Sequence, residues 1–354
     1  MTSHPVLVEV LRGSSIESFH RGALAIVDAE GTPHTLLGDM ARPVFPRSAV
    51  KVMQALPLVA SGAADRFGLV DAELALACAS HNGEAAHAAT AAAVLAKAGL
   101  DDSVLGCGAH WPMLDVAGRA LAAAGAQPSA LHNNCSGKHA GFVCVGCLMA
   151  ADRGQDPRAF LQGYVQPDHP LMREVTAALQ AATGCDLARA PMGTDGCAIP
   201  TFGLPLQAMA LGFARIGTGV GLSPAHAAAA ARLRRAVAAA PFMVAGSGRF
   251  DTRVMESLGE RLFCKVGAEG VYGAALPELG LGVALKMDDG NNARAAEVVM
   301  AAVIRALLPL QGPQAALVDS LCTPRLRNWN GTEVGRLQPA AALADALPAA
   351  PLQP

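Results

Sequence analysis

Lysine is scarce in this sequence. Five of the 27 basic residues are lysine, at positions 51, 97, 138, 265 and 286, and subtraction leaves 22 arginines. Because arginine can replace lysine wherever a solvated cation suffices, each remaining lysine is a candidate for a position that needs an amine able to lose its proton. The guanidinium group of arginine stays protonated and cannot fill such a position.

Aromatic and charged residues are also few, at 4% and 16% of the chain. The net charge is −2 (27 minus 29) and there is no basic run, so nucleic-acid binding has little support. Hydrophobic residues make up 52% of the chain and the mean hydropathy is +0.33, which excludes a disordered protein and predicts a large buried core.

Export and membrane signals are missing as well. The first ten residues lack a basic segment followed by an apolar one, so we predict no secretory signal and a cytoplasmic protein. The longest uncharged stretch near the middle, 196–214, contains Pro200, Pro205 and Gln207, and we interpret it as core and turn rather than a membrane span. The nine cysteines, an odd and scattered number, favour reduced thiols over a disulfide framework.

The apolar pattern divides the chain into strands, then helices, then strands. Short apolar runs at 5–12 and 21–29 are typical of antiparallel strands, and such runs return at 261–266, 270–275 and 281–287, before a helix near 291–308. Between them, alanine- and leucine-rich segments predict helices at about 48–61, 72–79, 84–99, 138–152, 169–183 and 224–239.

This order predicts an α+β fold in which both chain ends build one antiparallel sheet and a helical lobe is inserted between them. We expect a single two-lobed domain over residues 1–354, with a sheet lobe of about 1–45 and 241–330 and a helical lobe of about 46–240. A site would then lie between the lobes. The proline- and alanine-rich stretch at about 337–354 predicts a loosely held tail.

A serine–lysine pair opens the first predicted helix. Ser48 and Lys51 are three residues apart, so both side chains lie on one helical face and the amine can reach the hydroxyl. A neutral lysine can accept the proton of the serine, and the helix N-terminus favours the negative charge that then develops. A solvated surface pair is the alternative that this spacing alone leaves open.

Two further motifs follow in the chain. Ser80-His81-Asn82 comes after a predicted helix, and Lys265-Val266-Gly267 ends a predicted strand. The order Ser-x-x-Lys, Ser-x-Asn, Lys-x-Gly is nearly that of class A β-lactamases and penicillin-binding proteins. The three motifs together favour a serine acyl-transfer site.

A wider resemblance rests on five blocks of sequence: Arg-Ser-Ala-Val-Lys at 47–51, Ala-Ser-His-Asn-Gly-Glu at 79–84, His-Asn-Asn-Cys-Ser-Gly-Lys-His-Ala-Gly at 132–141, Asp-Gly-Cys at 195–197 and Lys-Met-Asp-Asp-Gly at 286–290. With them the chain resembles the Rhizobium-type L-asparaginases, also called the asparaginase II or class 3 family, over about residues 5–330. The resemblance implies a serine β-lactamase/glutaminase-like fold, a homodimer, and hydrolysis of L-asparagine to L-aspartate and ammonia.

The same resemblance implies two adjacent serine–lysine tandems, Ser48 with Lys51 and Ser80 with Lys265. We expect Ser48 to attack the side-chain amide with Lys51 as the base, while Ser80 and Lys265 relay a proton to the departing ammonia. Reversed roles for the two serines remain open. A buried site with a second ammonium nearby lowers the pKa of a lysine, which this chemistry needs.

A zinc site is also implied by the resemblance. Cys135 and Cys197 are small thiols that spacing alone would place in the core, and two thiolates are too few for a closed structural zinc site. The family places one zinc ion near the substrate with two cysteines and an unusual lysine ligand. We carry that role to Cys135, Lys138 and Cys197.

Substrate recognition needs charges of both signs, because an amino acid is a zwitterion. The expected contacts are Arg47 and His139 for the α-carboxylate, Asp195 for the ammonium group, and Asn133 and His81 for the amide. For each of them, a polar residue that caps a loop is the alternative. At the level of function, the alternatives are a β-lactamase-like or glutaminase-like serine amidase and a catalytically silent metal-binding protein on the same fold. No membrane partner is expected.

Overall fold

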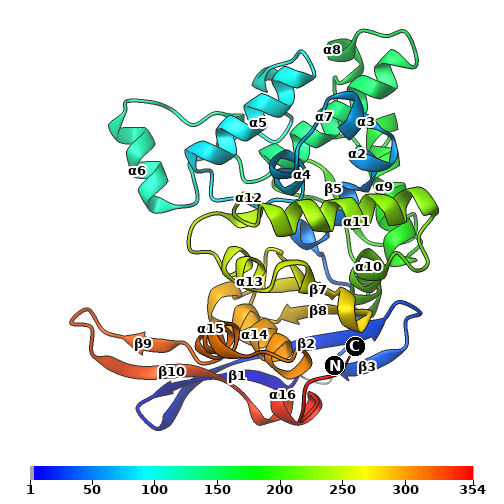
Figure 1. Ribbon diagram of the computed structural model, residues 1–354. Helices are drawn as coiled ribbons and strands as arrows, with labels where there is room; N and C mark the ends of the chain where they lie inside the picture. The colour runs from blue at the N-terminus through cyan, green and yellow to red at the C-terminus, as the bar shows by residue number, and fades with distance from the viewer. Residues whose placement is uncertain (1–3, 354) are drawn as a thin grey trace.

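The computed structural model describes residues 4–353, which form a sheet lobe and a helical lobe (Figure 1). Within them lies an eight-stranded antiparallel sheet of order β6-β7-β8-β2-β1-β10-β9, with β3 paired to β2. Both ends of the chain supply its strands: β1 (Val6–Arg12), β2 (Ser15–Asp28), β3 (Pro33–Leu37), β6 (Phe263–Val266), β7 (Val271–Leu276), β8 (Leu281–Met287), β9 (Arg325–Arg327) and β10 (Glu333–Pro339). The predicted α+β class, with a sheet built from both chain ends, is confirmed.

The segment between β3 and β6 is mainly helical and includes a small two-stranded sheet, β4 (Met192–Thr194) with β5 (Pro200–Phe202). The helices of the described chain are α1 (Lys51–Gln54), α2 (Leu56–Ala60), α3 (Ala63–Arg66), α4 (Asp71–Ala77), α5 (Ala85–Lys97), α6 (Asp115–Ala123), α7 (Ser136–Ala151), α8 (Pro157–Phe160), α9 (Pro170–Thr183), α10 (Leu206–Thr218), α11 (Pro224–Ala239), α12 (Phe242–Ala245), α13 (Phe250–Leu258), α14 (Glu297–Leu307), α15 (Gly312–Cys322) and α16 (Ala341–Ala346). No helix within residues 4–353 has the length and apolar character that crossing a membrane requires.

The centre of the sheet is covered on both faces. Successive side chains of a strand point to opposite faces, and β7 is buried along its whole length. Helix α10 covers one face closely, because a Cβ atom at Gly273 would lie 1.9 Å from the ring of Phe213. On the opposite face, the neighbouring Tyr272 donates a hydrogen bond to Asp251 of α13. The inserted segment therefore also supplies a cover for the sheet.

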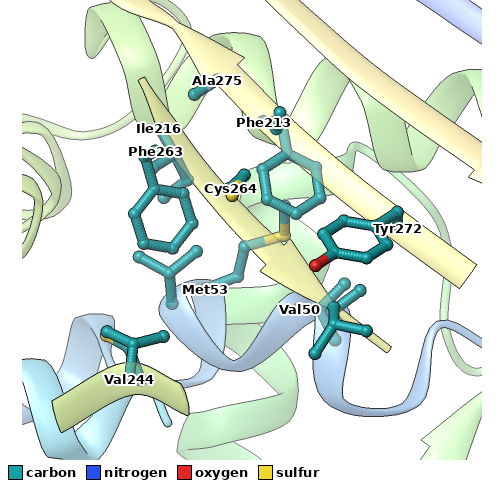
Figure 2. Close-up of a cluster of buried hydrophobic side chains, with 14 of the residues drawn as sticks. Val50, Met53, Phe213, Ile216, Val244, Phe263, Cys264, Tyr272 and Ala275 are labelled. Carbon is teal, nitrogen blue, oxygen red and sulfur yellow. The ribbon is translucent and has the colours of Figure 1, made fainter. Parts of the chain in front are cut away.

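The two lobes share one hydrophobic core. Figure 2 shows Val50 and Met53, from the start of the helical lobe, grouped with Phe213 of α10, Phe263 of β6 and Tyr272 of β7. All five side chains are almost fully buried. This packing holds the first turns of the helical lobe against β6, the strand that carries Lys265.

Several predicted helices are confirmed to within a few residues, namely α4, α5, α7, α9 and α11. The helix expected over 48–61 is instead divided into a 3₁₀ turn, η1 (Arg47–Val50), followed by α1 and α2. The second half of 196–214, which was interpreted as core and turn, is buried core and forms the start of α10, a helix that was not predicted. Pro205 precedes the first helical residue, where proline is harmless, and Gly212 gives Met53 room to approach.

The structure also corrects the expected loose tail at 337–354 over its described part. Strand β10 pairs with β1 as far as Pro339, and α16 buries Leu343 completely. Beyond α16, the N–H of Leu352 donates to the carbonyl of Leu307. Leu337, Gln338 and Pro339 therefore pair with β1, and the sheet lobe continues past residue 330.

Candidate active site

Lys51 is the centre of the site. Its side chain is 1% exposed, and its Nζ lies 2.9 Å from Ser80 Oγ, 2.5 Å from the carbonyl oxygen of Ala79, 3.3 Å from that of Asn134 and 3.1 Å from Cys135 Sγ. Carbonyl oxygens can only accept hydrogen bonds. The amine therefore contacts two carbonyl oxygens, one hydroxyl and one sulfur, and the hydroxyl of Ser80 is the oxygen with which it can exchange a proton.

The hydroxyl that Lys51 reaches belongs to Ser80 and not to Ser48, which the sequence spacing had suggested. Ser48 is half-buried in η1, and its hydroxyl has no hydrogen-bond partner among the described residues, although its carbonyl accepts the N–H of Lys51. The preceding Arg47 has a φ of 51°, in the left-handed region that side chains other than glycine rarely adopt. Such local strain is typical of functional sites.

Lys265 is the second buried lysine of the site. It is fully buried on β6, and its Nζ donates to the carbonyl of Val266 at 2.7 Å. Burial lowers the pKa of Lys265 to about 7; the charge of Asp251 opposes this shift, and that of Lys51 adds to it. The amine therefore exchanges its proton near neutral pH. Lys265 forms no hydrogen bond with Ser80 in this structure, in which Ser80 is hydrogen-bonded to Lys51 instead.

The segment that contains Ser80 is held by the last residues of α12 and by Ser247 just after it. The N–H of Ser80 donates to Val244 O at 2.9 Å, and that of Asn82 donates to Ala245 O at 2.9 Å. The Asn82 side chain donates to Ser247 O at 3.2 Å. These bonds fix Ser80, which follows the end of α4, beside Lys51, which begins α1.

His81 lies next to Ser80 but faces into the protein. The N–H of Gly83 donates to its Nδ1 at 3.0 Å, which assigns the ring hydrogen to Nε2, and Nε2 lies 2.9 Å from Ser136 Oγ. Its ring stacks on that of His87 with centroids 4.7 Å apart. Burial lowers the pKa of His81 well below its usual value. With both nitrogens engaged, His81 supports the start of α7 in this structure and presents no free donor to a ligand.

Asn133 is used in a similar way. Its Oδ1 accepts the N–H of Cys135 at 2.9 Å, and its Nδ2 donates to the carbonyls of Cys107 and Gly108 at 2.9 and 3.1 Å. The side chain is 4% exposed. In this structure the amide therefore positions Cys135 and has no spare hydrogen for a ligand.

The three residues expected to bind a metal lie together. Cys135 and Lys138 start α7 one turn apart, and Lys138 Nζ lies 3.0 Å from Cys197 Sγ, which comes from the turn after β4. All three side chains are almost fully buried. A hydrogen bond from Cys197 lowers the pKa of Cys135 and raises that of Cys197, because the two sulfurs share one proton.

This donor set fits a metal ion. Burial opposes the charge on Lys138, but the nearby sulfurs of Cys197 and Cys135 raise its pKa on balance, so protons now hold the three groups together. A divalent ion replaces such protons when it binds. Two sulfurs and one nitrogen leave a fourth tetrahedral position open, as catalytic zinc sites do. No cluster of three or more His, Cys, Asp or Glu side chains that could hold a metal ion occurs within residues 4–353.

Arg47 and Asp195 form an ion pair beside this cluster, with Nε of Arg47 2.6 Å from Oδ1 of Asp195. Burial opposes ionisation of Asp195, but Lys138 and Arg47 lower its pKa on balance. The two residues expected to bind opposite ends of an amino acid therefore neutralise each other here. A cavity of about 450 Å³ opens beside Arg47, between the lobes, lined also by Arg42, Phe45, Thr194, Glu269 and Lys286.

His139 keeps one nitrogen free. Its Nδ1 lies 2.6 Å from the hydroxyl of Tyr164, which accepts the N–H of Gly106 and so donates to His139. This places the ring hydrogen on Nε2, which is buried and has no partner among the described residues. Burial lowers the pKa of His139, so the ring is neutral. A buried, unpaired N–H suits contact with a ligand.

The motifs did not reveal every residue around the site. Tyr164 orients His139, and Tyr272 donates to Asp251 behind Lys265. They are the two tyrosines of the chain. In a sequence with 4% aromatic residues their rarity was a usable signal, but nothing in the sequence pattern connected them to the lysines.

Residues 8–339 match the family model for L-asparaginase II. Because this match covers nearly the whole chain, it defines the class of protein as an amidohydrolase of the asparaginase type. The chain belongs to the L-asparaginase II family. No curated protein matches the sequence. Among solved structures, a β-lactamase from Mycobacterium bovis is 14% identical, with 78% of this chain and 90% of that chain covered and a TM-score of 0.36.

Proposed function

We propose that the protein hydrolyses L-asparagine to L-aspartate and ammonia, with Ser48, Lys51, Ser80 and Lys265 as its catalytic residues. One observation carries this proposal: a fully buried lysine amine, Lys51, is hydrogen-bonded to a serine hydroxyl within a chain of the L-asparaginase II family. Nucleophilic catalysis by serine requires such a base within hydrogen-bond reach.

The following proton path uses the Lys51–Ser80 hydrogen bond and requires the Ser48 hydroxyl, which has no partner among the described residues, to approach Lys51 when substrate binds. The more accessible hydroxyl of Ser48 attacks the amide carbon, and its proton passes to Lys51. The carbon–nitrogen bond then breaks, and the leaving nitrogen takes a proton from Ser80, which Lys51 replaces through their 2.9 Å contact. Water hydrolyses the resulting ester of Ser48. In this path Ser80 works with Lys51, and Lys265 acts as a neighbouring amine that exchanges protons near pH 7.

Substrate recognition rests on Arg47, which lines the cavity, and on Asp195 and His139 behind it. We propose that the α-carboxylate displaces Asp195 from part of the Arg47 guanidinium and meets Nε2–H of His139, while the ammonium group pairs with Asp195. His81 and Asn133 serve this site as supports for α7 and Cys135, given that their polar atoms are already bonded within the protein.

We also propose one zinc ion per chain, held by Cys135, Lys138 and Cys197. When bound, such an ion supplies positive charge that stabilises a developing oxyanion or positions the substrate. The chain's own residues prepare the ligands: Asn133 fixes the backbone of Cys135, and Lys51 contacts its sulfur.

The cytoplasmic location and the homodimer stay predictions. Trp111, Met113 and Val116, exposed near and on α6, are an apolar surface that a second copy would cover.

The function is tested by measuring ammonia release from L-asparagine and L-glutamine, together with hydrolysis of a chromogenic β-lactam. We expect release from asparagine and no β-lactam hydrolysis. Hydrolysis of the β-lactam without activity on asparagine would replace the proposal with a β-lactamase-like amidase. A rise in melting temperature with asparagine but no ammonia would identify a catalytically silent binding protein.

The pH dependence follows from Lys265. Its pKa of about 7 in the folded protein lies below the usual value for lysine, so the amine is uncharged above pH 7 and charged below it. We expect kcat/KM for asparagine to rise as the pH passes through about 7 and to level off above it. Initial rates across about pH 5 to 10 measure this. A profile that is flat through neutrality would contradict a role for this amine in turnover.

The metal proposal is tested by elemental analysis of purified protein. We expect about one zinc per chain in the wild type and almost none after Cys135→Ser or Cys197→Ser, because a serine oxygen is a poor substitute for a thiolate ligand. Cys185→Ser is the matched control, since Cys185 is half-buried and outside the site. Zinc-free wild type, or equal zinc in all four proteins, would count against the site.

A further inference from the structure

Strand β6 lies at the edge of the sheet and pairs with β7 alone. Lys265 stands opposite Gly273, and Val266 stands opposite Tyr272. In an antiparallel pair, alternate residues direct their N–H and C=O groups away from the partner strand. At the edge of a sheet these outward groups need other partners. On β6 the residue with outward groups next to Lys265 is Val266.

Both outward groups of Val266 are occupied. Its N–H donates to Oδ2 of Asp251 at 3.2 Å, and its carbonyl accepts the Nζ of Lys265 at 2.7 Å. The second oxygen of Asp251 accepts the hydroxyl of Tyr272, and the thiol of Cys264 lies 3.7 Å from it. Asp251 thus contacts the residues before and after Lys265 on β6, and the residue opposite Val266 on β7.

The carboxylate is hard to explain as a stabilising feature alone. Asp251 is 1% exposed, and no positively charged side chain contacts it among the described residues. Burying a carboxylate is costly unless it is well hydrogen-bonded, and an apolar side chain would cover the same edge at lower cost. A buried charge in such a place points to a task at the neighbouring amine.

We propose that Asp251 is a positioning residue for Lys265, and this rests on the function proposed above. Through Val266 and Tyr272 it fixes the strand edge that holds the amine, and its negative charge keeps that amine able to take up a proton. Asp251 does not touch the substrate; it acts through Lys265.

Other charges also act on the amine. Lys51 of α1 and Arg249 before α13 lower the pKa of Lys265, whereas Asp251 and Cys135 raise it against the effect of burial. Glu297 of α14 is close to Asp251, and burial raises the pKa of Glu297 to about 7. Among these charges, that of Asp251 has the largest effect on the pKa of Lys265, and it opposes the effect of burial.

The first experiment compares Asp251→Asn with the wild type. The substitution removes the charge and the acceptor for Val266 N–H. We expect kcat to fall about 10- to 100-fold with KM within about threefold, as for supporting hydrogen-bond partners of other sites. Because the charge of Asp251 favours the protonated amine, its loss moves the acid limb of the kcat/KM profile to lower pH.

Two further variants separate charge from support. Tyr272→Phe removes a hydrogen bond that supports Asp251, so we expect kcat to fall by about threefold or more. Because the variant keeps the carboxylate, the acid limb stays in place. Glu73→Gln is the matched control, because Glu73 is a buried carboxylate that pairs with Lys97 away from the site. Wild-type kcat and an unmoved acid limb in Asp251→Asn, or an equal loss in Glu73→Gln, would overturn the proposal. Should Asp251→Asn not fold, Tyr272→Phe decides, and wild-type kcat there overturns it.

A measurement without turnover separates this proposal from the proposed function. Between about pH 7 and 10, Lys265 is neutral in the folded state and charged in the unfolded state, so its contribution to stability increases with pH. Lys265→Met removes this rise, and Asp251→Asn extends it below pH 7. If the wild type releases no ammonia, the function fails, but the unfolding curves still test the inference. A curve for Asp251→Asn parallel to the wild type would overturn it.

Discussion

Replacing Lys51 with arginine is expected to lower asparagine turnover about a thousandfold or more. Arginine keeps the positive charge, but its guanidinium group cannot accept the proton of a serine. General-base catalysis contributes about 10² to 10⁴ to a rate, and Lys51 serves two proton transfers in the proposed path. The measurement is kcat for ammonia release, with a melting curve to show that the variant is folded.

Lys97→Arg is the control for this substitution. Lys97 lies 2.6 Å from Glu73 and needs only a positive charge, so arginine there leaves turnover unchanged. Because Lys51 is fully buried and arginine is larger, Lys51→Met serves as a second variant of similar length without an amine. If either folded variant at position 51 keeps a kcat within tenfold of the wild type, Lys51 is not the base.

Replacing each of the two serines with alanine is expected to impair a different step of the reaction. Ser48→Ala removes the proposed nucleophile and abolishes turnover, by at least about a thousandfold. Ser80→Ala removes the hydroxyl that Lys51 contacts at 2.9 Å, so protonation of the leaving nitrogen slows by about a hundredfold, but Ser48 can still attack. The steady-state rate of ammonia release gives both losses.

Peptide mass spectrometry after acid quenching distinguishes the roles. We expect a β-aspartyl ester on Ser48 in the wild type and in Ser80→Ala, and none in Ser48→Ala. Ser14→Ala, in the exposed turn between β1 and β2, is the control for serine removal and keeps full activity. Near-wild-type ammonia release by Ser48→Ala would end the assignment, and an ester on Ser80 would reverse the two roles.

The fold was partly predictable because its strands and helices have clear local patterns. The apolar runs at 261–266, 270–275 and 281–287 correspond to β6, β7 and β8. Strands β9 and β10 and helix α10 were missed. Helix α10 begins behind Pro205 and contains Gly212, which look like helix-ending residues until Met53 is seen against Gly212. Such contacts between distant segments leave no local signal.

The candidate site was predictable as a set of residues but not as a set of contacts. The motifs named Ser48, Lys51, Ser80 and Lys265; spacing suggested the pair Ser48–Lys51, and the family resemblance implied the pair Ser80–Lys265. In the structure Lys51 instead reaches Ser80, because the end of α12 hydrogen-bonds the Ser80 segment and holds it beside α1. A hydrogen bond between residues 29 positions apart depends on that packing.

The sequence by itself determined which residue types are present: three of its five lysines, Lys51, Lys138 and Lys265, fall in the motifs of the candidate site and carry amines that, unlike the guanidinium group of arginine, can lose a proton. Residue type decides what chemistry a side chain can perform. Only the tertiary structure decided how the three lysines differ in their contacts and pKa values, because burial and neighbouring charges act through space. It placed Lys138 against Cys197, gave Lys265 a pKa of about 7, and buried Asp251 behind it.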